Sequence, residues 1–202
     1  MVSFYQRLAT IPNELVLFSA AYDDLLEQAF RAAKKPFVTL TSVMPHDTHA
    51  QGRVRVSYSG MTKGQTDSLC THDDVSALDL QGYSLIYKVR GTYSATEQTD
   101  EQVLTESHYF SFARQVDTII PNYVVRKLQR LGCLFVGYYP TYWEERLLAK
   151  AVLERVPEGM RHALHLTHAQ PSLENAFWQR YGVKSHAMDL SELEHYMAKA
   201  LV

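Results

Sequence analysis

Short apolar runs, each followed by a turn and then by an amphipathic segment, recur along this chain. One such unit is CLFVGYYPTYWEERLL, residues 133–148. Its first four residues are bulky and β-prone, so they predict a buried strand, and Gly137 then permits a sharp turn. Trp143, Leu147 and Leu148 follow at helical spacing, which predicts a helix with one packed face. A strand, a glycine turn and a helix form half of a parallel α/β unit.

Helix ends can be placed from short polar and glycine signals. In a capping box, a hydroxyl accepts from a backbone N–H of the first turn while a carboxylate three residues later reaches back. Thr141 and Glu144 have this spacing, and so do Ser191 and Glu194 before a closing helix. Gly132 follows another amphipathic segment, where a left-handed C-cap is natural.

The same strand-turn-helix pattern opens the chain. Residues 14–19 are a β-prone run, residues 22–34 carry an apolar helical face, and a second β-prone run follows Pro36 at 37–40. This βαβ order demands a right-handed crossover and predicts a parallel sheet. The remaining predicted elements are strands at 84–89, 162–167 and 183–187, and helices before Pro12 and at 105–116, 122–131 and 172–181.

Residues 41–83 interrupt this pattern, because the segment is polar and glycine-rich. Its one alternating stretch, 53–57, predicts an edge strand within an insertion. The chain has 202 residues, 46% of them hydrophobic, which suffices for one compact core. We therefore predict a single α/β domain over residues 1–202, with a Rossmann-like three-layer parallel sheet and helices on both faces.

Composition narrows the classes of partner. With 20 basic and 22 acidic residues and no long run of either sign, the chain has no electrostatic footprint for nucleic acid or an anionic membrane. No apolar run approaches the roughly 20 residues that cross a bilayer, so a cytoplasmic protein is expected. Cys70 and Cys133 cannot form a disulfide framework or a four-thiolate zinc site, and Cys133 is expected to be a core thiol.

Histidine clusters are the remaining signal for metal binding. His46 and His49 lie close together, and His162, His165 and His168 recur at every third position. On a strand, His165 would point away from the other two, because side chains alternate between faces. Few other ligand types accompany either cluster, so we predict no metal site.

Three of the strand-to-helix junctions resemble motifs of bacterial sirtuin-like domains, a group that includes NAD-consuming proteins of antiphage defence. SAAYDDLLEQAF (19–30) is similar to T-T-N-Y-D-x-L-L-E, and IYKVRG (86–91) is similar to K-L-H-G. LFVGYYPTYWEERLL (134–148) is similar to the family's strand, G-Y-S turn, D-W pair and arginine-containing helix. The resemblance runs from about Phe4 to the C-terminus, covers the C-terminal two-thirds of the family's domain, and implies a Rossmann-like fold.

The same motifs depart from the family at its catalytic positions. In active members the asparagine of the first motif positions a ribose or a water, and the histidine of the second is the general base. Ala21 and Arg90 occupy these positions here. Alanine cannot orient water and arginine stays protonated, so the resemblance implies a degenerate site with no catalytic residue. Tyr139 and Tyr142 replace the turn serine and the aspartate, and the family's glycine-rich first strand has no counterpart.

Five residues remain as candidates for a remnant NAD or ADP-ribose site: Asp23, Arg90, Gly91, Gly137 and Tyr138. Asp23 could hold a ribose hydroxyl, or it could be a helix-start carboxylate favoured by the helix dipole. Arg90 could bind a phosphate or a partner's carboxylate bidentately, or it could be a solvated surface arginine. The two glycines satisfy strand-ending turns without any ligand.

These observations favour a catalytically inactive sirtuin-like domain that acts as a binding or structural subunit of a bacterial assembly or defence system. A protein partner or a homo-oligomer is expected, and no cofactor is required. Two alternatives stay open: an NAD-hydrolysing antiphage enzyme completed by a partner chain, and a non-catalytic nucleotide or ADP-ribose sensor. The aromatic row Tyr138, Tyr139, Tyr142 and Trp143 could form an interface, and Tyr139 and Tyr142 could instead plug a vacated cleft.

Overall fold

The computed structural model of the chain describes residues 2–43, 53–60, 68–93, 102–116, 118–165 and 172–200. The chain divides into two compact units, Met1–Tyr123 and Val124–Val202, and α4 (Asn122–Leu131) leads from the first into the second. Its helices and its mixture of parallel and antiparallel strands agree with the predicted Rossmann-like α/β class. The three-layer arrangement and the single domain over residues 1–202 stay predictions.

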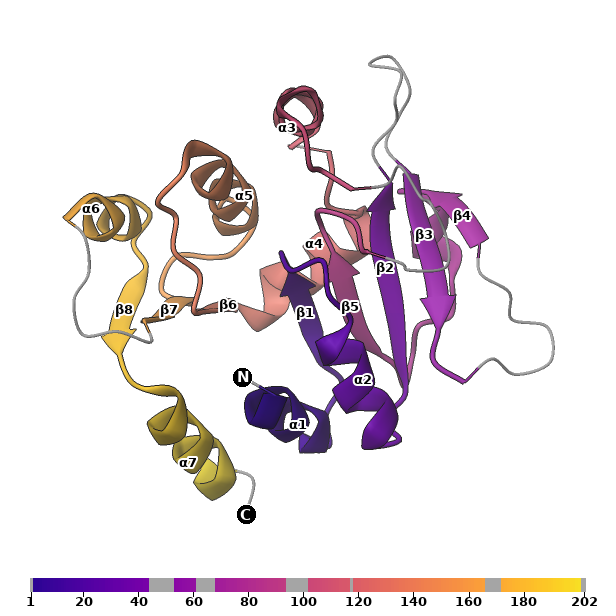
Figure 1. Ribbon diagram of the computed structural model, residues 1–202, viewed down its shortest axis with the longest axis horizontal. Helices are drawn as coiled ribbons and strands as arrows, with labels where there is room; N and C mark the ends of the chain where they lie inside the picture. The colour runs from indigo at the N-terminus through magenta and orange to yellow at the C-terminus, as the bar shows by residue number, and fades with distance from the viewer. Residues whose placement is uncertain are drawn as a thin grey trace. The chain divides into compact units, whose positions relative to one another are not determined.

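The first unit is built on a five-stranded sheet with the order β1-β5-β2-β3-β4 (Figure 1). Its strands are β1 (Val16–Ser19), β2 (Phe37–Val43), β3 (Arg53–Tyr58), β4 (Ser68–Thr71) and β5 (Ser84–Lys88). β5 pairs in parallel with both β1 and β2, as the predicted crossovers require. β3 and β4 add to β2 in antiparallel fashion.

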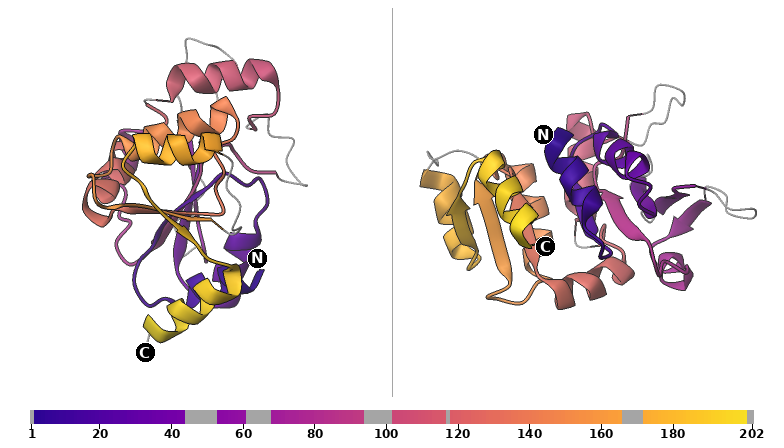
Figure 2. Two further views of the ribbon diagram at one scale, coloured as in Figure 1. Left: turned by 90° about the vertical axis from the view of Figure 1, so that its left-hand side faces the viewer. Right: turned by 90° about the horizontal axis from the view of Figure 1, so that it is seen from below.

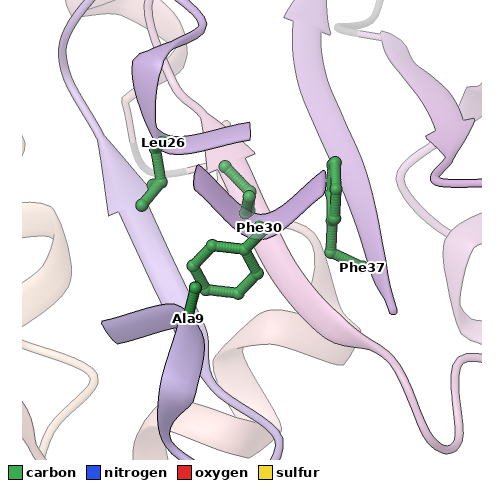
Figure 3. Close-up of a cluster of buried hydrophobic side chains, with 5 residues drawn as sticks. Ala9, Leu26, Phe30 and Phe37 are labelled. Atoms are coloured by element: carbon green, nitrogen blue, oxygen red, sulfur yellow. The ribbon is translucent and has the colours of Figure 1, made fainter. Parts of the chain in front are cut away.

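Helices of the first unit bury its core against this sheet. They are α1 (Val2–Thr10), α2 (Leu25–Ala32), the short η1 (Asp74–Ala77) and α3 (Glu106–Gln115). Ala9 of α1 and Phe30 of α2 meet Phe37 and Ile86 of the sheet in one buried cluster (Figure 3). On the opposite face, the buried Tyr87 hydroxyl donates to the carbonyl oxygen of Ile119. The sheet therefore buries side chains on both faces.

The second unit has a three-stranded parallel sheet with the order β6-β7-β8. Its elements are β6 (Cys133–Val136), α5 (Trp143–Leu153), β7 (Arg161–His165), α6 (Ser172–Arg180), β8 (Lys184–Ala187) and α7 (Leu190–Ala200). α5 and α6 cover one face of the sheet, where Leu153 and Trp178 pack with Phe135 and Ala163. Figure 2 shows α7 leading away on the side opposite to α5 and α6.

Two predictions within the insertion were wrong. The stretch at 53–57 forms β3, but β3 lies between β2 and β4 and is not an edge strand. The outer strand is β4, which sequence analysis missed because it is only four residues long. The second wrong prediction is the end of the strand expected at 37–40. As β2 it continues to Val43, because the polar residues Thr41 and Ser42 are buried as part of the strand.

Both predicted capping boxes were also wrong in register. At α5 the backbone N–H of Tyr142 donates to Glu145 Oε2 over 3.3 Å, one residue beyond the predicted pair. At α7 the pair is Asp189 and Glu192: the N–H of Glu192 donates to Asp189 Oδ1 over 2.8 Å, and the N–H of Asp189 donates to Glu192 Oε2 over 3.0 Å. An aspartate is as good an N-cap as a serine, so spacing alone did not separate the alternatives.

Candidate functional site

The turn after β1 carries the first group of candidate residues. Ser19 ends the strand, and its Oγ accepts from the backbone N–H of Ala21 over 3.3 Å. Ala21 offers only a methyl group at this place. The exposed Asp23 accepts from the N–H of Leu25 over 3.1 Å through Oδ1, so its carboxylate stabilises the turn into α2. The predicted contact of Asp23 with a ribose hydroxyl stays a prediction.

The turn after β5 carries the second group. Gly91 is buried with a φ of +83°, a conformation that favours glycine, and its N–H donates to Lys88 O over 3.3 Å. Arg90 is partly buried, and its Cζ lies 5.9 Å from the ring centroid of Tyr109 on α3. Its Nε and Nη2 atoms are buried and have no hydrogen-bond partner within the described residues.

These two turns lie at the same edge of the sheet, because β1 and β5 are parallel neighbours. The N–H of Val89 donates to Ser19 O over 3.2 Å, and the N–H of Tyr93 donates to Tyr22 O over 2.9 Å. The structure therefore brings the turns of Asp23, Arg90 and Gly91 together at the carboxyl ends of parallel strands, where ligands of α/β proteins bind. Gly137 and Tyr138 belong to the second unit.

A buried ion pair lies directly beneath this edge. Lys88 Nζ is 3.5 Å from Glu27 Oε1, and the two side chains are 0% and 5% exposed. Lys88 Nζ also donates to the backbone carbonyl of Asp23. This pair was not predicted, although Glu27 belongs to the YDDLLE segment and Lys88 to IYKVRG. The ion pair thus ties the two motifs to each other.

Tyr22 connects the same edge to the segment before α3. Its hydroxyl donates to Val103 O over 2.6 Å, and the N–H of Val103 donates to Arg90 O over 3.2 Å. Burial, and then a hydrogen bond with Tyr109, raise the pKa of Tyr22 to about 12, against a smaller opposing effect of Arg90. The Tyr22 phenol therefore stays protonated at neutral pH and acts as a structural donor.

The turn after β6 serves packing in this structure. Gly137 has a φ of +60°, and its N–H donates to Leu164 O over 3.1 Å. The Tyr138 ring lies 5.6 Å from the Phe135 ring, and its hydroxyl donates to Glu145 O over 2.8 Å. Tyr138 thus joins the core beneath α5, and its predicted contact with a nucleotide stays a prediction.

Two of the other aromatic residues of this turn are largely exposed. Tyr142 is 65% exposed and Trp143 is 47% exposed, so Tyr142 fills no cleft and Trp143 does not pack as predicted. The face of α5 that packs is instead centred on Leu148 and Val152. Tyr139 is half-buried.

Thr141 and Glu174 form a contact that sequence analysis also missed. The Thr141 hydroxyl donates to Glu174 Oε1 over 2.5 Å, which links the loop before α5 to the first turn of α6. Glu174 is 3% exposed, and its Oε2 has no hydrogen-bond partner within the described residues. No local pattern reveals this contact, because it depends on the packing of α5 and α6 side by side.

A shallow groove of about 530 Å³ lies in the second unit, on the sheet face opposite to Phe135 and Ala163. Its lining combines apolar side chains with two histidines: Leu131, Gly132, Cys133, Leu134, Gly159, Met160, His162, Leu164 and His186. The His162 and His186 rings are stacked, with Nδ1 and Nε2 3.4 Å apart. The groove reaches the start of β6, where Gly132 and Cys133 line it.

The described ranges contain no group of three or more residues able to hold a metal ion. His46, His49 and His168 lie outside those ranges, so their predicted lack of a metal stays a prediction. Burial raises the pKa of Cys133 to about 11, which keeps this thiol protonated at neutral pH and agrees with a core role. Among the same residues, none of the helices has the length and apolar character needed to cross a membrane.

The comparison with known families adds to this geometry. A sequence model of the SIR2-like domain matches residues 15–186, which include both turns at the edge of β1 and β5 as well as the turn after β6. The chain belongs to the SIR2-like domain family. It has no match among curated proteins.

The SIR2-like assignment confirms the resemblance that the three junction motifs predicted. In this SIR2-like domain, the YDDLLE and IYKVRG segments are adjacent in space and joined through Lys88 and Glu27. Ala21 directly precedes the first segment and Arg90 lies in the second, both at the edge formed by β1 and β5.

Proposed function

We propose that this SIR2-like domain is catalytically inactive and acts as a binding or structural subunit of a bacterial multiprotein assembly, including assemblies of antiphage defence. The observation that carries the proposal is the chemistry at the edge of β1 and β5. Ala21 has no polar group to position a water, and the Arg90 guanidinium stays protonated at physiological pH. Neither residue can transfer the proton that cleavage of a glycosidic bond to ribose requires.

The other polar side chains described near this edge support the same conclusion. Lys88 is buried in its pair with Glu27 and is not free to act as a base. The Tyr22 phenol has a raised pKa, which keeps it neutral, and it donates to Val103. Among the described residues, the Ser19 hydroxyl forms hydrogen bonds only with the backbone of Ala21. These groups stabilise the turn, and none is arranged as a nucleophile with an adjacent base.

Exposed apolar side chains support the binding role. Leu131, Leu134 and Met160 are 61%, 53% and 38% exposed, and all three line the groove of the second unit. Concentrated exposed apolar surface of this kind is typical of protein interaction sites. The expected partner is therefore a protein, either another subunit or a second copy of the chain.

The catalytic part of the proposal is tested by incubating the purified chain with NAD and measuring released nicotinamide by chromatography. We expect no release above the buffer blank, while an active NAD hydrolase run in parallel releases nicotinamide. Release that disappears in Arg90→Ala would overturn the proposal. The partner-completed hydrolase alternative predicts nicotinamide release once the chain is copurified with its partner from the producing bacterium, and no release would count against it.

The binding part is tested by capturing partners of the chain from a lysate of the producing bacterium. Leu134→Lys places a charge in the groove, so it should reduce capture of a groove partner at least severalfold. Leu173→Lys is the matched control, because Leu173 is 55% exposed on α6 and does not line the groove. Equal capture by both variants would contradict a partner site at the groove.

A further inference from the structure

Arg90 presents two buried donors without acceptors at the carboxyl end of β5. The atoms are Nε and Nη2, and neither has a hydrogen-bond partner within the described residues. These two nitrogens lie on one edge of the guanidinium plane, and their hydrogens point in the same direction. This edge forms two parallel bonds to the oxygens of a carboxylate or a phosphate. A buried donor left unpaired is unfavourable, and more so on a charged group, so an acceptor at this edge would be strongly favoured.

One described contact reaches the guanidinium of Arg90, and another holds its backbone. The Tyr109 ring lies 5.9 Å from Cζ, in the range of a cation–π contact. The backbone of Arg90 accepts from Val103 N over 3.2 Å, and Val103 O in turn accepts from the Tyr22 hydroxyl. A side chain that is already positioned loses little conformational entropy on binding, which favours capture of a small anion.

The nearby carboxylates are used elsewhere. Glu27 pairs with Lys88, and Asp23 accepts from the N–H of Leu25. Within the described part of the chain, no carboxylate accepts from Nε or Nη2 of Arg90. The Arg90 turn and the turn after Ser19 share the carboxyl edge of two parallel strands, where a ligand is expected.

We propose that Arg90 is the anchor of an oxyanion site, in which Nε–H and Nη2–H donate in parallel to a carboxylate or phosphate group of a small ligand. The inference rests on the proposed function, because it gives the edge of β1 and β5 a binding role in place of proton transfer. The inference also names the class of ligand expected at that edge, a small molecule with a carboxylate or phosphate group. Lysine cannot reproduce the site, since an ammonium group lacks the planar pair of donors.

The test is a magnetic resonance titration of the isotope-labelled chain with inorganic phosphate and, separately, with acetate, at an ionic strength held constant with sodium chloride. The observables are the Nε–H signal of Arg90 and the backbone amide of Gly91. We expect a saturable shift of both signals with at least one anion. A response to phosphate alone identifies a phosphate site, and a response to acetate alone identifies a carboxylate site. A response to both shows that the site binds either kind of oxyanion.

Arg90→Lys should bind about tenfold more weakly when followed by the Gly91 amide, since one of two parallel charge-assisted bonds is lost. The matched control is Arg31→Lys, because Arg31 also lies over an aromatic ring, 5.7 Å from the Phe37 centroid, but is 58% exposed. The control should bind like the natural chain.

Two results would overturn the oxyanion site: no saturable shift with either anion, or unchanged binding by a folded Arg90→Lys. If that variant does not fold, the titration of the natural chain decides alone. Nicotinamide release in the NAD assay bears on the proposed function only, so the failures of the two proposals are distinguishable.

Discussion

Lys88 on β5 and Glu27 on α2 form a buried ion pair, with Nζ and Oε1 3.5 Å apart. The pair joins the two sequence segments that most resemble the family motifs, and Lys88 also donates to the carbonyl of Asp23 at the helix start. The resemblance at these positions therefore has a structural cause that does not depend on catalysis. A chain that lost its proton-transfer groups would still need the pair to hold α2 against the sheet.

Removing one member of this pair should strongly destabilise the first unit. Lys88→Met leaves the Glu27 carboxylate buried without its cation, and the expected cost is about 3–5 kcal/mol. The double variant Lys88→Met/Glu27→Leu should lose less than Lys88→Met alone, because no buried charge remains. Hydrogen exchange at increasing urea concentration, followed on peptides from α2 and β5, measures the effect.

The matched control for that prediction is the exposed pair Lys150 and Glu154, whose side chains are 42% and 45% exposed and 3.0 Å apart. Lys150→Met should cost only about 0.3–0.5 kcal/mol, the usual range for a helix-surface pair. A cost for Lys88→Met as small as that of the control would show that the buried pair is not structural.

Tyr22 should titrate later than an ordinary tyrosine. Its pKa in the folded chain is about 12, against 10.0 for an unperturbed phenol. Between these values the folded state holds a proton that the unfolded state has lost, so the stability contributed by Tyr22 is complete below pH 10 and falls as the pH rises toward 12. The difference in phenolate absorbance between the natural chain and Tyr22→Phe, read immediately after a pH jump, should have its midpoint near pH 12. A midpoint near pH 10 would contradict the burial of this hydroxyl.

Replacing Gly132 with alanine should destabilise the fold more than the same change at Gly182. It ends α4 with a φ of +73°, and an added Cβ would lie 2.7 Å from the carbonyl oxygen of Met160. The left-handed conformation alone costs about 1–2 kcal/mol for a residue with a Cβ, and crowding adds about 1–3 kcal/mol. Gly182→Ala is the matched control, since Gly182 has a φ of +62° and open space around the added atom. Urea unfolding followed by tryptophan fluorescence reports on this unit, because Trp143 and Trp178 both belong to it.

The N-terminus of α7 should depend on Asp189 rather than on the predicted Ser191. Asp189→Ala removes the acceptor for the N–H of Glu192 and should cost about 1 kcal/mol. Ser191→Ala removes only a donor to Asp189 Oδ1 and should cost less. The same fluorescence-detected unfolding ranks the two variants, and a larger loss for Ser191→Ala would favour the register predicted from sequence.

Apolar runs located the strands well, because a buried parallel strand leaves a continuous hydrophobic stretch. The runs before Ser19 and before Arg90 could be recognised in this way, and the parallel order then placed their turns at one edge. β4 was not recognisable, since a four-residue outer strand with half its residues exposed resembles a loop.

Contacts between elements distant in sequence could not be predicted. Lys88 meets Glu27, and Thr141 meets Glu174, only after the strands and helices have packed. The helical spacing of Trp143 was compatible with burial, but the buried residues of α5 all lie further along the helix, from Leu148 to Leu153. Residue spacing also did not show which of the polar residues near the start of α7 is its N-cap, because Asp189 and Ser191 are each followed by a glutamate three residues later.

The outer position of β6 in its sheet has a practical consequence for anyone who purifies this protein. The strand reads CLFV, carries neither a charge nor a proline, and exposes 53% of Leu134. Natural proteins usually place charged residues or proline on outer strands to discourage edge-to-edge pairing with another sheet. In their absence, concentrated samples should form soluble aggregates through this strand, and a solubilising lysine at Leu134 is the first substitution to introduce before crystallisation trials.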